Sequence, residues 1–214
     1  MWSRRKMLLL RMENAIIRRL EAKSRCLVAE NQGLMARCRE LERNQKSPHD
    51  PRTGALTAEY FDDTVEKLLH NRHRRLDEGS EHIALVMVDL DLLKPVNDSY
   101  GHASGDEVLR SFSEVAQNQL RENDLVARYG GDEFTILLRG SPEVSVQGII
   151  EKLRHKFEGT VFTFHRSTKK ATRLHPSFSF GVALYRGKGD SLVKMLARAD
   201  KNMYAQKKMR KASR

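Results

Sequence analysis

Leucines recur every seven residues near the start of the chain, at Leu20, Leu27, Leu34 and Leu41. Three positions before each of them lie Ile17, Ser24, Asn31 and Cys38. This heptad pattern with leucine at d predicts a helix over residues 10–45 that forms a two-stranded coiled coil. Asn31 at an a position favours a parallel homodimer, because two buried amides pair only when they face each other. Ser24 and Cys38 weaken the seam, so a single amphipathic helix docked elsewhere is the alternative.

The heptads stop at residues 47–51, where two prolines interrupt the pattern. We therefore divide the chain into an N-terminal helix, a linker and a globular domain, at 1–46, 47–56 and 57–214. Helical periodicity predicts helices near 57–78, after Ser104, after Ser141-Pro142 and from about 191. Apolar runs predict strands near 83–89, 125–129, 133–138 and 177–185. Helices interleaved with strands around one sheet predict an α/β (α+β) fold.

Candidate chemistry lies where two of these strands end. Residues 128–134 read Arg-Tyr-Gly-Gly-Asp-Glu-Phe, and two glycines between apolar runs predict a tight hairpin. The apolar run 83–88 stops at Asp89, and Asp91 lies on the same face. Three or four carboxylates are therefore expected to converge, a pattern that suits nucleotidyl transfer with Mg²⁺. Taken alone, Gly-Gly followed by acids is also ordinary hairpin sequence.

The sequence after the first strand of the sheet narrows the interpretation of the hairpin. Residues 89–107 read Asp-Leu-Asp-Leu-Leu-Lys-Pro-Val-Asn-Asp-Ser-Tyr-Gly-His-Ala-Ser-Gly-Asp-Glu. With the hairpin, this stretch resembles the GGDEF family of diguanylate cyclases, and the resemblance covers roughly residues 50–214. It implies a nucleotidyl-cyclase-like palm domain with a central, mostly antiparallel sheet flanked by helices. It also implies condensation of two GTP into cyclic di-GMP, with release of two pyrophosphates and Mg²⁺ or Mn²⁺ as cofactor.

The resemblance implies roles for individual residues. The metal ligands are expected to be Asp89, the Leu90 carbonyl, Asp132 and Glu133. Asp132 is also the expected base for the attacking 3′-hydroxyl, Glu133 supports it, and Lys94 stabilises charge on the phosphates. The nucleotide is expected to contact Asn97, His102 and Asp106, of which Asn97 and Asp106 read the guanine edge.

Several of these residues also have ordinary structural interpretations. Ser104 and Glu107 fit a capping box, in which Asp106 only favours the helix dipole. An Asn-Asp pair at residues 97–98 is common in turns. Lys94 fits a solvated surface charge, and His102 fits a loop histidine. Asp91 is expected to be structural.

Two further segments resemble the family's Arg-x-x-Asp inhibitory site and its phosphate-binding C-terminal helix. Arg121 and Asp124 match the first in spacing, which predicts inhibition by cyclic di-GMP; a helix-end ion pair is the alternative. In the second, Lys207 matches a phosphate-binding lysine and Lys211 replaces an arginine, which keeps the charge but loses the bidentate fork. Two neighbouring positions also depart from the family, with Gln206 in place of alanine and Arg210 in place of glycine.

The start of the domain departs from the family as well. The family's opening segment reads Asp-x-Leu-Thr-Gly-Leu. This chain keeps Asp50, Thr53 and Gly54, and it has Arg52 and Ala55 at the two leucine positions.

Composition and charge limit the remaining functional classes. The net charge is +11, and residues 1–46 hold 12 Lys and Arg against 5 Asp and Glu, or +7 of that total. A DNA-binding basic zipper is therefore one alternative, although residues 7–10 interrupt its basic flank with Met-Leu-Leu-Leu. A catalytically inactive cyclic di-GMP receptor is the other. Cys26 and Cys38 lack metal-ligand spacing. No run is long enough for a membrane span, and we expect a cytoplasmic protein.

Overall fold

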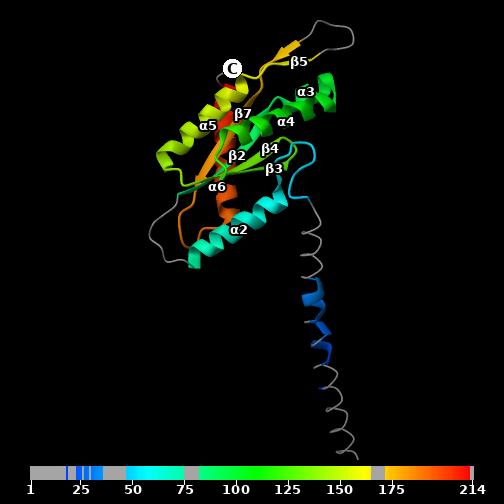
Figure 1. Ribbon diagram of the computed structural model, residues 1–214, viewed down its shortest axis with the longest axis vertical. Helices are drawn as coiled ribbons and strands as arrows, with labels where there is room; N and C mark the ends of the chain where they lie inside the picture. The colour runs from blue at the N-terminus through cyan, green and yellow to red at the C-terminus, as the bar shows by residue number, and fades with distance from the viewer. Residues whose placement is uncertain are drawn as a thin grey trace, which may run out of the picture. The chain divides into compact units, whose positions relative to one another are not determined.

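The computed structural model describes residues 18, 23–25, 27–28, 30–35, 47–74, 82–164 and 172–212, the last two residues of α2 and of α6 by backbone only. The chain divides into two compact units, Met1–Ser47 and Pro48–Arg214 (Figure 1). In the first unit the described residues from 18 to 35 are helical, and Leu27 and Leu34 expose 52% and 55% of their surface. The other predicted seam leucines, Leu20 and Leu41, lie outside the described residues, as do Ile17 and Cys38. The coiled coil stays a prediction.

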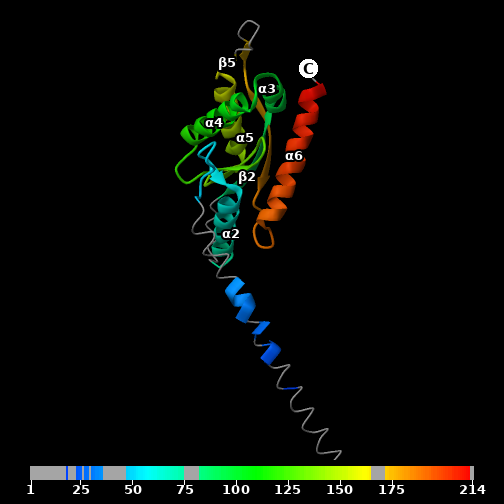
Figure 2. The same ribbon diagram turned by 90° about the vertical axis from the view of Figure 1, so that its right-hand side faces the viewer.

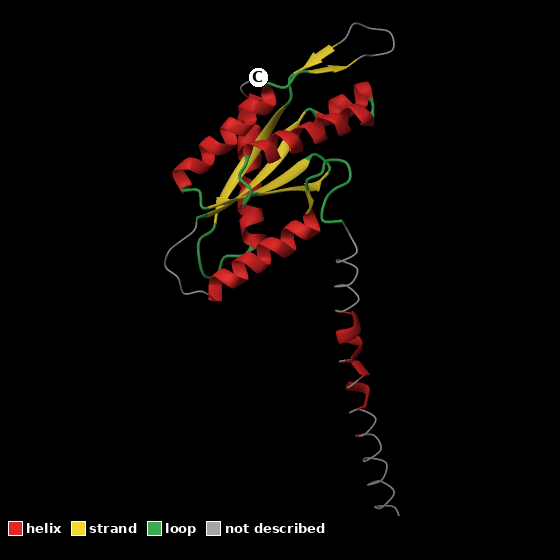
Figure 3. Ribbon diagram, in the orientation of Figure 1, coloured by secondary structure: helices red, strands yellow, loops and turns green. Residues whose placement is uncertain are grey.

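The second unit is built on a five-stranded sheet with the order β1-β3-β4-β2-β7 (Figure 3). Its strands are β1 (Leu56–Thr57), β2 (Ile83–Asp91), β3 (Leu125–Gly130), β4 (Glu133–Arg139) and β7 (Ser177–Leu184). The short β1 pairs parallel with β3, and every other neighbouring pair is antiparallel. The prediction of a mostly antiparallel sheet flanked by helices is confirmed. A separate two-stranded sheet contains β5 (Phe162–Phe164) and β6 (Thr172–Leu174).

Alternation along β2 divides the core into two layers. Ala84, Val86 and Val88 pack on one face, with α3 (Leu93–Tyr100), α4 (His102–Gln119) and α5 (Glu143–Glu158). Ile83, Leu85 and Met87 pack on the other face, with α2 (Ala58–Arg74) and α6 (Leu192–Ala212). Figure 2 shows α6 on the opposite side of the sheet from α4 and α5. Since every second strand residue faces the same way, nearly continuous apolar character lets β2 serve both layers.

The structure corrects the expected helix boundaries at three places. The stretch after β2 forms a helix, α3, that the sequence pattern did not predict. The next helix begins at His102 with Gly101 as its N-cap, so Ser104 is no cap; its hydroxyl donates to the Tyr100 carbonyl. Likewise α5 has Pro142 at its N-cap, and no side chain caps that end. Among the described residues, no helix is long and apolar enough to cross a membrane.

Candidate functional site

The hairpin between β3 and β4 carries the central candidate residues. Its two-residue turn needs glycine, because Gly131 has φ of 51° and the left-handed region is costly for other residues. The register shifts between Arg128 and Gly130, so one extra residue bends the strand just before the turn. The Asp132 carbonyl accepts a hydrogen bond from the Leu90 N–H at 3.1 Å. The hairpin tip is thereby held against the end of β2.

Strand register places two predicted metal ligands side by side. Asp89 on β2 lies directly opposite Glu133 on β4. Asp89 is buried, with 8% of its surface exposed. Burial raises the pKa of Glu133, and the negative charges of Asp89, Asp132 and Asp200 raise it further, against the opposing charge of Lys207. The site is a region of negative charge in which a cation is stabilised.

A lysine from the last helix already supplies one positive charge. The Lys207 ammonium donates to Asp89 Oδ1 at 2.6 Å. Burial by itself would lower the pKa of Lys207, but the hydrogen bond and charge of Asp89 outweigh it, and the pKa is raised. The structure therefore brings Lys207 to the carboxylates that the sequence assigned to metal binding.

Asp89, Asp132 and Glu133 lie close enough for their charges to affect one another, but they do not form a ready-made metal site. Across residues 47–74, 82–164 and 172–212, no three His, Cys, Asp or Glu side chains form a group that could hold a metal ion. Asp89 instead binds the Lys207 ammonium. Metal binding at this site stays a prediction.

A polar stripe on α6 sets the position of Lys207. Four side chains spaced four residues apart bond the outer edge of β7: Arg198 to the Leu184 carbonyl, Asn202 to the Val182 carbonyl, Gln206 to the Phe180 N–H and Arg210 to the Phe178 carbonyl. Four helical residues rise about 6 Å and two strand residues about 6.7 Å, so the two repeats match. Sequence reasoning missed this stripe, although its spacing of four was visible.

Arg210 also reaches the far end of β2. Its Nη1 lies 3.2 Å from Asp91 Oδ2, and its Nη2 donates to Ser177 Oγ at 2.8 Å. Ser179 Oγ donates to the other Asp91 oxygen at 3.1 Å. Asp91 thus has partners on α6 and β7, in agreement with a structural role. The side chain of Lys211 lies outside the described residues.

The predicted nucleotide-contacting residues lie on α3 and α4, two helices separated by a single residue. Lys94 and His102 are exposed, at the first turns of α3 and α4. Asn97 Oδ1 is buried and has no hydrogen-bond partner among the described residues. Asp106 lies in α4, where its Oδ1 is 3.7 Å from Nη1 of Arg52. Asn97 Oδ1 packs against Gly105, where an added Cβ would lie 1.9 Å away, and the nucleotide contacts stay predictions.

The opening segment is fixed to the hairpin by Arg128, a residue to which the sequence analysis gave no role. Asp50 Oδ1 accepts hydrogen bonds from the N–H and hydroxyl of Thr53 at 2.9 and 2.8 Å. Arg128 lies 3.4 Å from the same oxygen and donates to the Gly131 carbonyl at 2.8 Å. One guanidinium therefore joins the start of the domain to the glycine turn.

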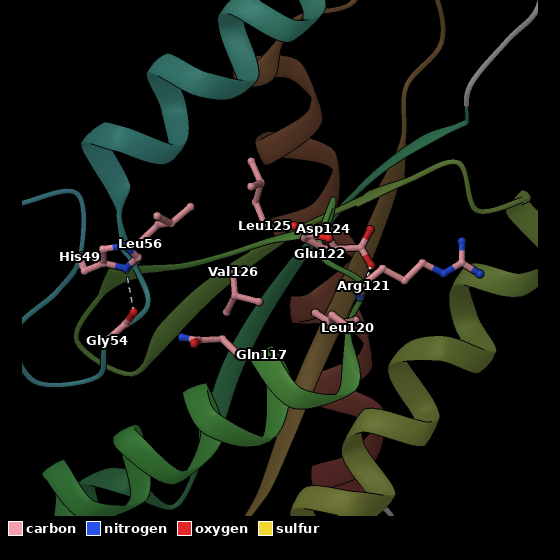
Figure 4. A pocket seen from close by; sticks show the side chains of 10 residues that line it. All are labelled: His49, Gly54, Leu56, Gln117, Leu120, Arg121, Glu122, Asp124, Leu125 and Val126. Atoms are coloured by element: carbon pink, nitrogen blue, oxygen red, sulfur yellow. Dashed lines mark hydrogen bonds between the residues drawn. The ribbon is translucent and has the colours of Figure 1, made fainter.

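Arg121 and Asp124 line a pocket of about 280 Å³ between the opening segment, the end of α4 and the start of β3 (Figure 4). The Asp124 carboxylate accepts from the backbone N–H groups of Arg121 and Arg139, both at 3.0 Å. The Arg121 side chain extends away from the other labelled side chains. In place of an ion pair between the two side chains, the structure shows Asp124 bonded to the backbone of Arg121.

Comparisons with known proteins agree with this architecture. The family described as "Diguanylate cyclase, GGDEF domain" matches residues 47–213. The chain is 31% identical over 158 residues to the response regulator PleD of Caulobacter vibrioides, covering 74% of this chain and 33% of PleD. It is 31% identical over 202 residues to diguanylate cyclase TpbB of Pseudomonas aeruginosa, covering 94% of this chain and 42% of TpbB. The chain thus spans about a third to two fifths of the length of these curated relatives.

A solved structure gives the same result for the fold. The coiled coil and GGDEF domain of DgcB from Caulobacter crescentus, solved with c-di-GMP, superposes with a TM-score of 0.67 at 28% identity. The match covers 88% of this chain and 94% of that one. By its family match and by its relatives, this chain belongs to the GGDEF family of diguanylate cyclases.

Proposed function

We propose that this chain is a diguanylate cyclase that condenses two GTP into cyclic di-GMP. The observation that carries the proposal is the intact Gly-Gly-Asp-Glu-Phe hairpin with Glu133 opposite the buried Asp89. In each half-reaction a 3′-oxygen forms a bond to the α-phosphorus of the other GTP, and the bond from that phosphorus to pyrophosphate breaks. The proton of the 3′-hydroxyl passes to a carboxylate of the hairpin.

The chain's own residues divide this work. Asp132, at the hairpin tip, accepts the proton, and Glu133 supports it. Lys94 and Lys207 place positive charge where the phosphates develop negative charge. Lys207 is well suited to this, because its ammonium already lies among the carboxylates and its raised pKa keeps it charged. We propose the same role for Lys211, whose side chain lies outside the described residues.

The negative charge around the hairpin favours a divalent cation. Asp89 already binds one cation, the Lys207 ammonium, and Glu133 lies in the negative field of Asp89 and Asp132. The ligands we propose are Asp89, the Leu90 carbonyl, Asp132 and Glu133. When bound, Mg²⁺ or Mn²⁺ neutralises phosphate oxygens and lowers the pKa of the attacking hydroxyl.

Two copies of the domain are needed, because each binds one GTP. The exposed leucines of the N-terminal helix, Leu27 and Leu34, support a coiled-coil homodimer. Such a coil raises the effective concentration of one domain near the other, which turns a rare encounter into a local one. We place the reaction in the cytoplasm, where GTP is available.

The test is incubation of the full chain with GTP and Mg²⁺, or Mn²⁺, followed by chromatography of the products. We expect cyclic di-GMP and pyrophosphate in a ratio of one to two. Asp132→Ala is expected to abolish the product while leaving the fold intact. Cyclic di-GMP formation by this variant at the wild-type rate would overturn the assignment of Asp132.

We also propose that cyclic di-GMP inhibits the enzyme at the pocket that contains Arg121 and Asp124. The pocket volume supports a ligand site, and Arg121 at its rim supplies the guanidinium for a phosphate once its side chain turns toward the pocket. Arg121→Ala is expected to relieve inhibition by added product without changing the initial rate. If the wild type binds cyclic di-GMP but makes none from GTP, the chain is a receptor instead, the alternative that this pocket also favours.

A further inference from the structure

Arg52 stands where the family's opening segment has leucine, and its backbone is held in a fixed turn. Asp50 Oδ1 accepts hydrogen bonds from the N–H of Arg52 at 3.2 Å and from the N–H of Thr53 at 2.9 Å. Arg128 holds the same carboxylate from the hairpin side at 3.4 Å. The position of Arg52 is therefore set by both the opening segment and the glycine turn.

The Arg52 side chain crosses to α4 and meets Asp106. Nη1 of Arg52 lies 3.7 Å from Asp106 Oδ1, and the two side chains are 63% and 34% exposed. This distance exceeds a hydrogen bond, and an exposed ion pair contributes little to stability. A guanidinium carries five N–H donors, so Arg52 has donors left for a ligand.

The helix surface beside Asp106 is fixed by the packing of Asn97 against Gly105. Asn97 Oδ1 is buried without a hydrogen-bond partner among the described residues. It faces Gly105, where an added Cβ would lie 1.9 Å from that oxygen. Gly105 thus leaves room for the Asn97 amide, and this close packing holds the start of α4, with Asp106, against α3.

We infer that Arg52 is a specificity-determining residue that recognises guanine together with Asp106, an inference that rests on the function proposed above. A carboxylate accepts from guanine N1–H and the 2-amino group, whereas arginine donates to O6 and N7. In guanine, O6 is attached to the carbon next to N1. The residues that bind these two atoms must therefore be neighbours, as Arg52 and Asp106 are. A leucine at this position has no hydrogen-bond donor and cannot bind O6 or N7.

The test measures nucleotide binding to the full chain without turnover. The probes are GTP with a methylene group between the α- and β-phosphorus, which cannot release pyrophosphate, and its 7-deaza counterpart, which lacks N7. For the wild type we expect about tenfold weaker binding of the 7-deaza probe. For Arg52→Leu we expect about tenfold weaker binding of the guanine probe and no difference between the two probes. The affinity of Arg52→Lys for the guanine probe is expected to lie between those of the wild type and Arg52→Leu, because lysine keeps the charge but lacks the bidentate fork.

Arg173→Leu is the matched control, since it removes the same charge from an exposed position on β6. It is expected to bind both probes as the wild type does, which separates recognition from net charge. Thermal melting of each variant checks that the fold is retained. Tighter binding by Arg52→Leu would overturn the inference, because Arg52 would then obstruct the site, and so would unchanged binding.

The two hypotheses fail separately. If the wild type cyclises GTP but Arg52→Leu still binds the 7-deaza probe more weakly than the guanine probe, only the role of Arg52 is wrong. If Arg52 controls discrimination at N7 but no cyclic di-GMP forms with Mg²⁺ or Mn²⁺, the recognition inference holds and the cyclase assignment fails.

Discussion

Carboxylates in this domain have opposite pKa shifts because their surroundings differ. The pKa of Asp190 is lowered, first by its hydrogen bonds to the Arg198 guanidinium at 2.6 and 2.9 Å and then by backbone N–H groups, against the effect of burial. The pKa of Glu133 is raised, because burial and the charges of Asp89 and Asp132 disfavour its ionised form. The first arrangement stabilises the fold, and the second favours cation binding.

Asp190→Asn is expected to destabilise the domain by about 1–3 kcal/mol at pH 7, because it removes charged hydrogen bonds to Arg198. The pKa of Asp190 is lower in the folded state than its usual 3.8. Its contribution is therefore present above about pH 4 and is lost as pH falls through the folded pKa. Urea denaturation at pH 7 and pH 3 measures the difference from wild type. We expect it to shrink at pH 3; an equal difference at both pH values would contradict the assignment.

Divalent metal is expected to stabilise the wild type, because it neutralises the field around Asp89 and Glu133. At a concentration 100 times its dissociation constant, the gain is about 2.7 kcal/mol. Thermal melting with Mg²⁺ and with EDTA measures this gain. Asp132→Asn is expected to reduce it, whereas Asp98→Asn, at an exposed position on α3, is expected to preserve it. Equal gains in both variants would remove Asp132 from the proposed ligand set.

At the scale of elements, α6 both stabilises the domain and positions a residue of the candidate site. It covers one face of the sheet and bonds the edge of β7 with a polar stripe. It also carries Lys207 to Asp89. Its close approach to β7 depends on Gly181, where an added Cβ would lie 2.1 Å from the Ala199 carbonyl and 2.2 Å from the Met203 nitrogen.

Gly181→Ala is expected to destabilise the domain by about 1–3 kcal/mol or more, since both obstructing atoms belong to backbone. The variant should also lower cyclase activity, because α6 moves away from β7 and takes Lys207 with it. Gly148→Ala in α5 is the matched control, with no atom within 4 Å of the added Cβ. There we expect stabilisation of about 0.5–1 kcal/mol, from better helix propensity. Denaturant unfolding measures both, and a harmless Gly181→Ala would show that the contact relaxes easily.

At the scale of the whole molecule, catalysis depends on how often two domains meet. The N-terminal unit exposes Leu27 and Leu34 at predicted d positions and Val28 and Met35 beside them. Exposed apolar residues at heptad spacing favour self-association. The proposed coil therefore affects the rate by raising the local concentration of one domain near another.

Leu34→Asp is expected to weaken the dimer, because a charge at a d position is buried in the seam. Sedimentation should shift toward monomer, and activity per domain should rise steeply with protein concentration. Gln32→Asp, on the opposite side of the heptad, adds the same charge and is expected to leave both unchanged. A Leu34→Asp variant that remains dimeric, with full activity at low concentration, would place dimerisation elsewhere.

The sequence by itself determined the features that depend on local pattern. Period-two and continuous apolar runs located β2 and the hairpin, because side-chain alternation is a local property of strands. Gly131 followed from the turn, which needs a left-handed residue. Local pattern failed at α3, where Pro95 looks like a helix breaker. Proline is tolerated in the first helical turn, because the backbone N–H groups there have no partner within the helix.

Only the tertiary structure decided which distant residues meet. Lys207 reaches Asp89 across 118 positions of sequence, and Arg52 reaches Asp106 from a different segment. The departures at Gln206 and Arg210 looked like losses in the C-terminal motif, yet both side chains bond the edge of β7. No local rule assigns such partners, because they depend on how a helix and a sheet pack, and on a glycine that lets their backbones approach closely.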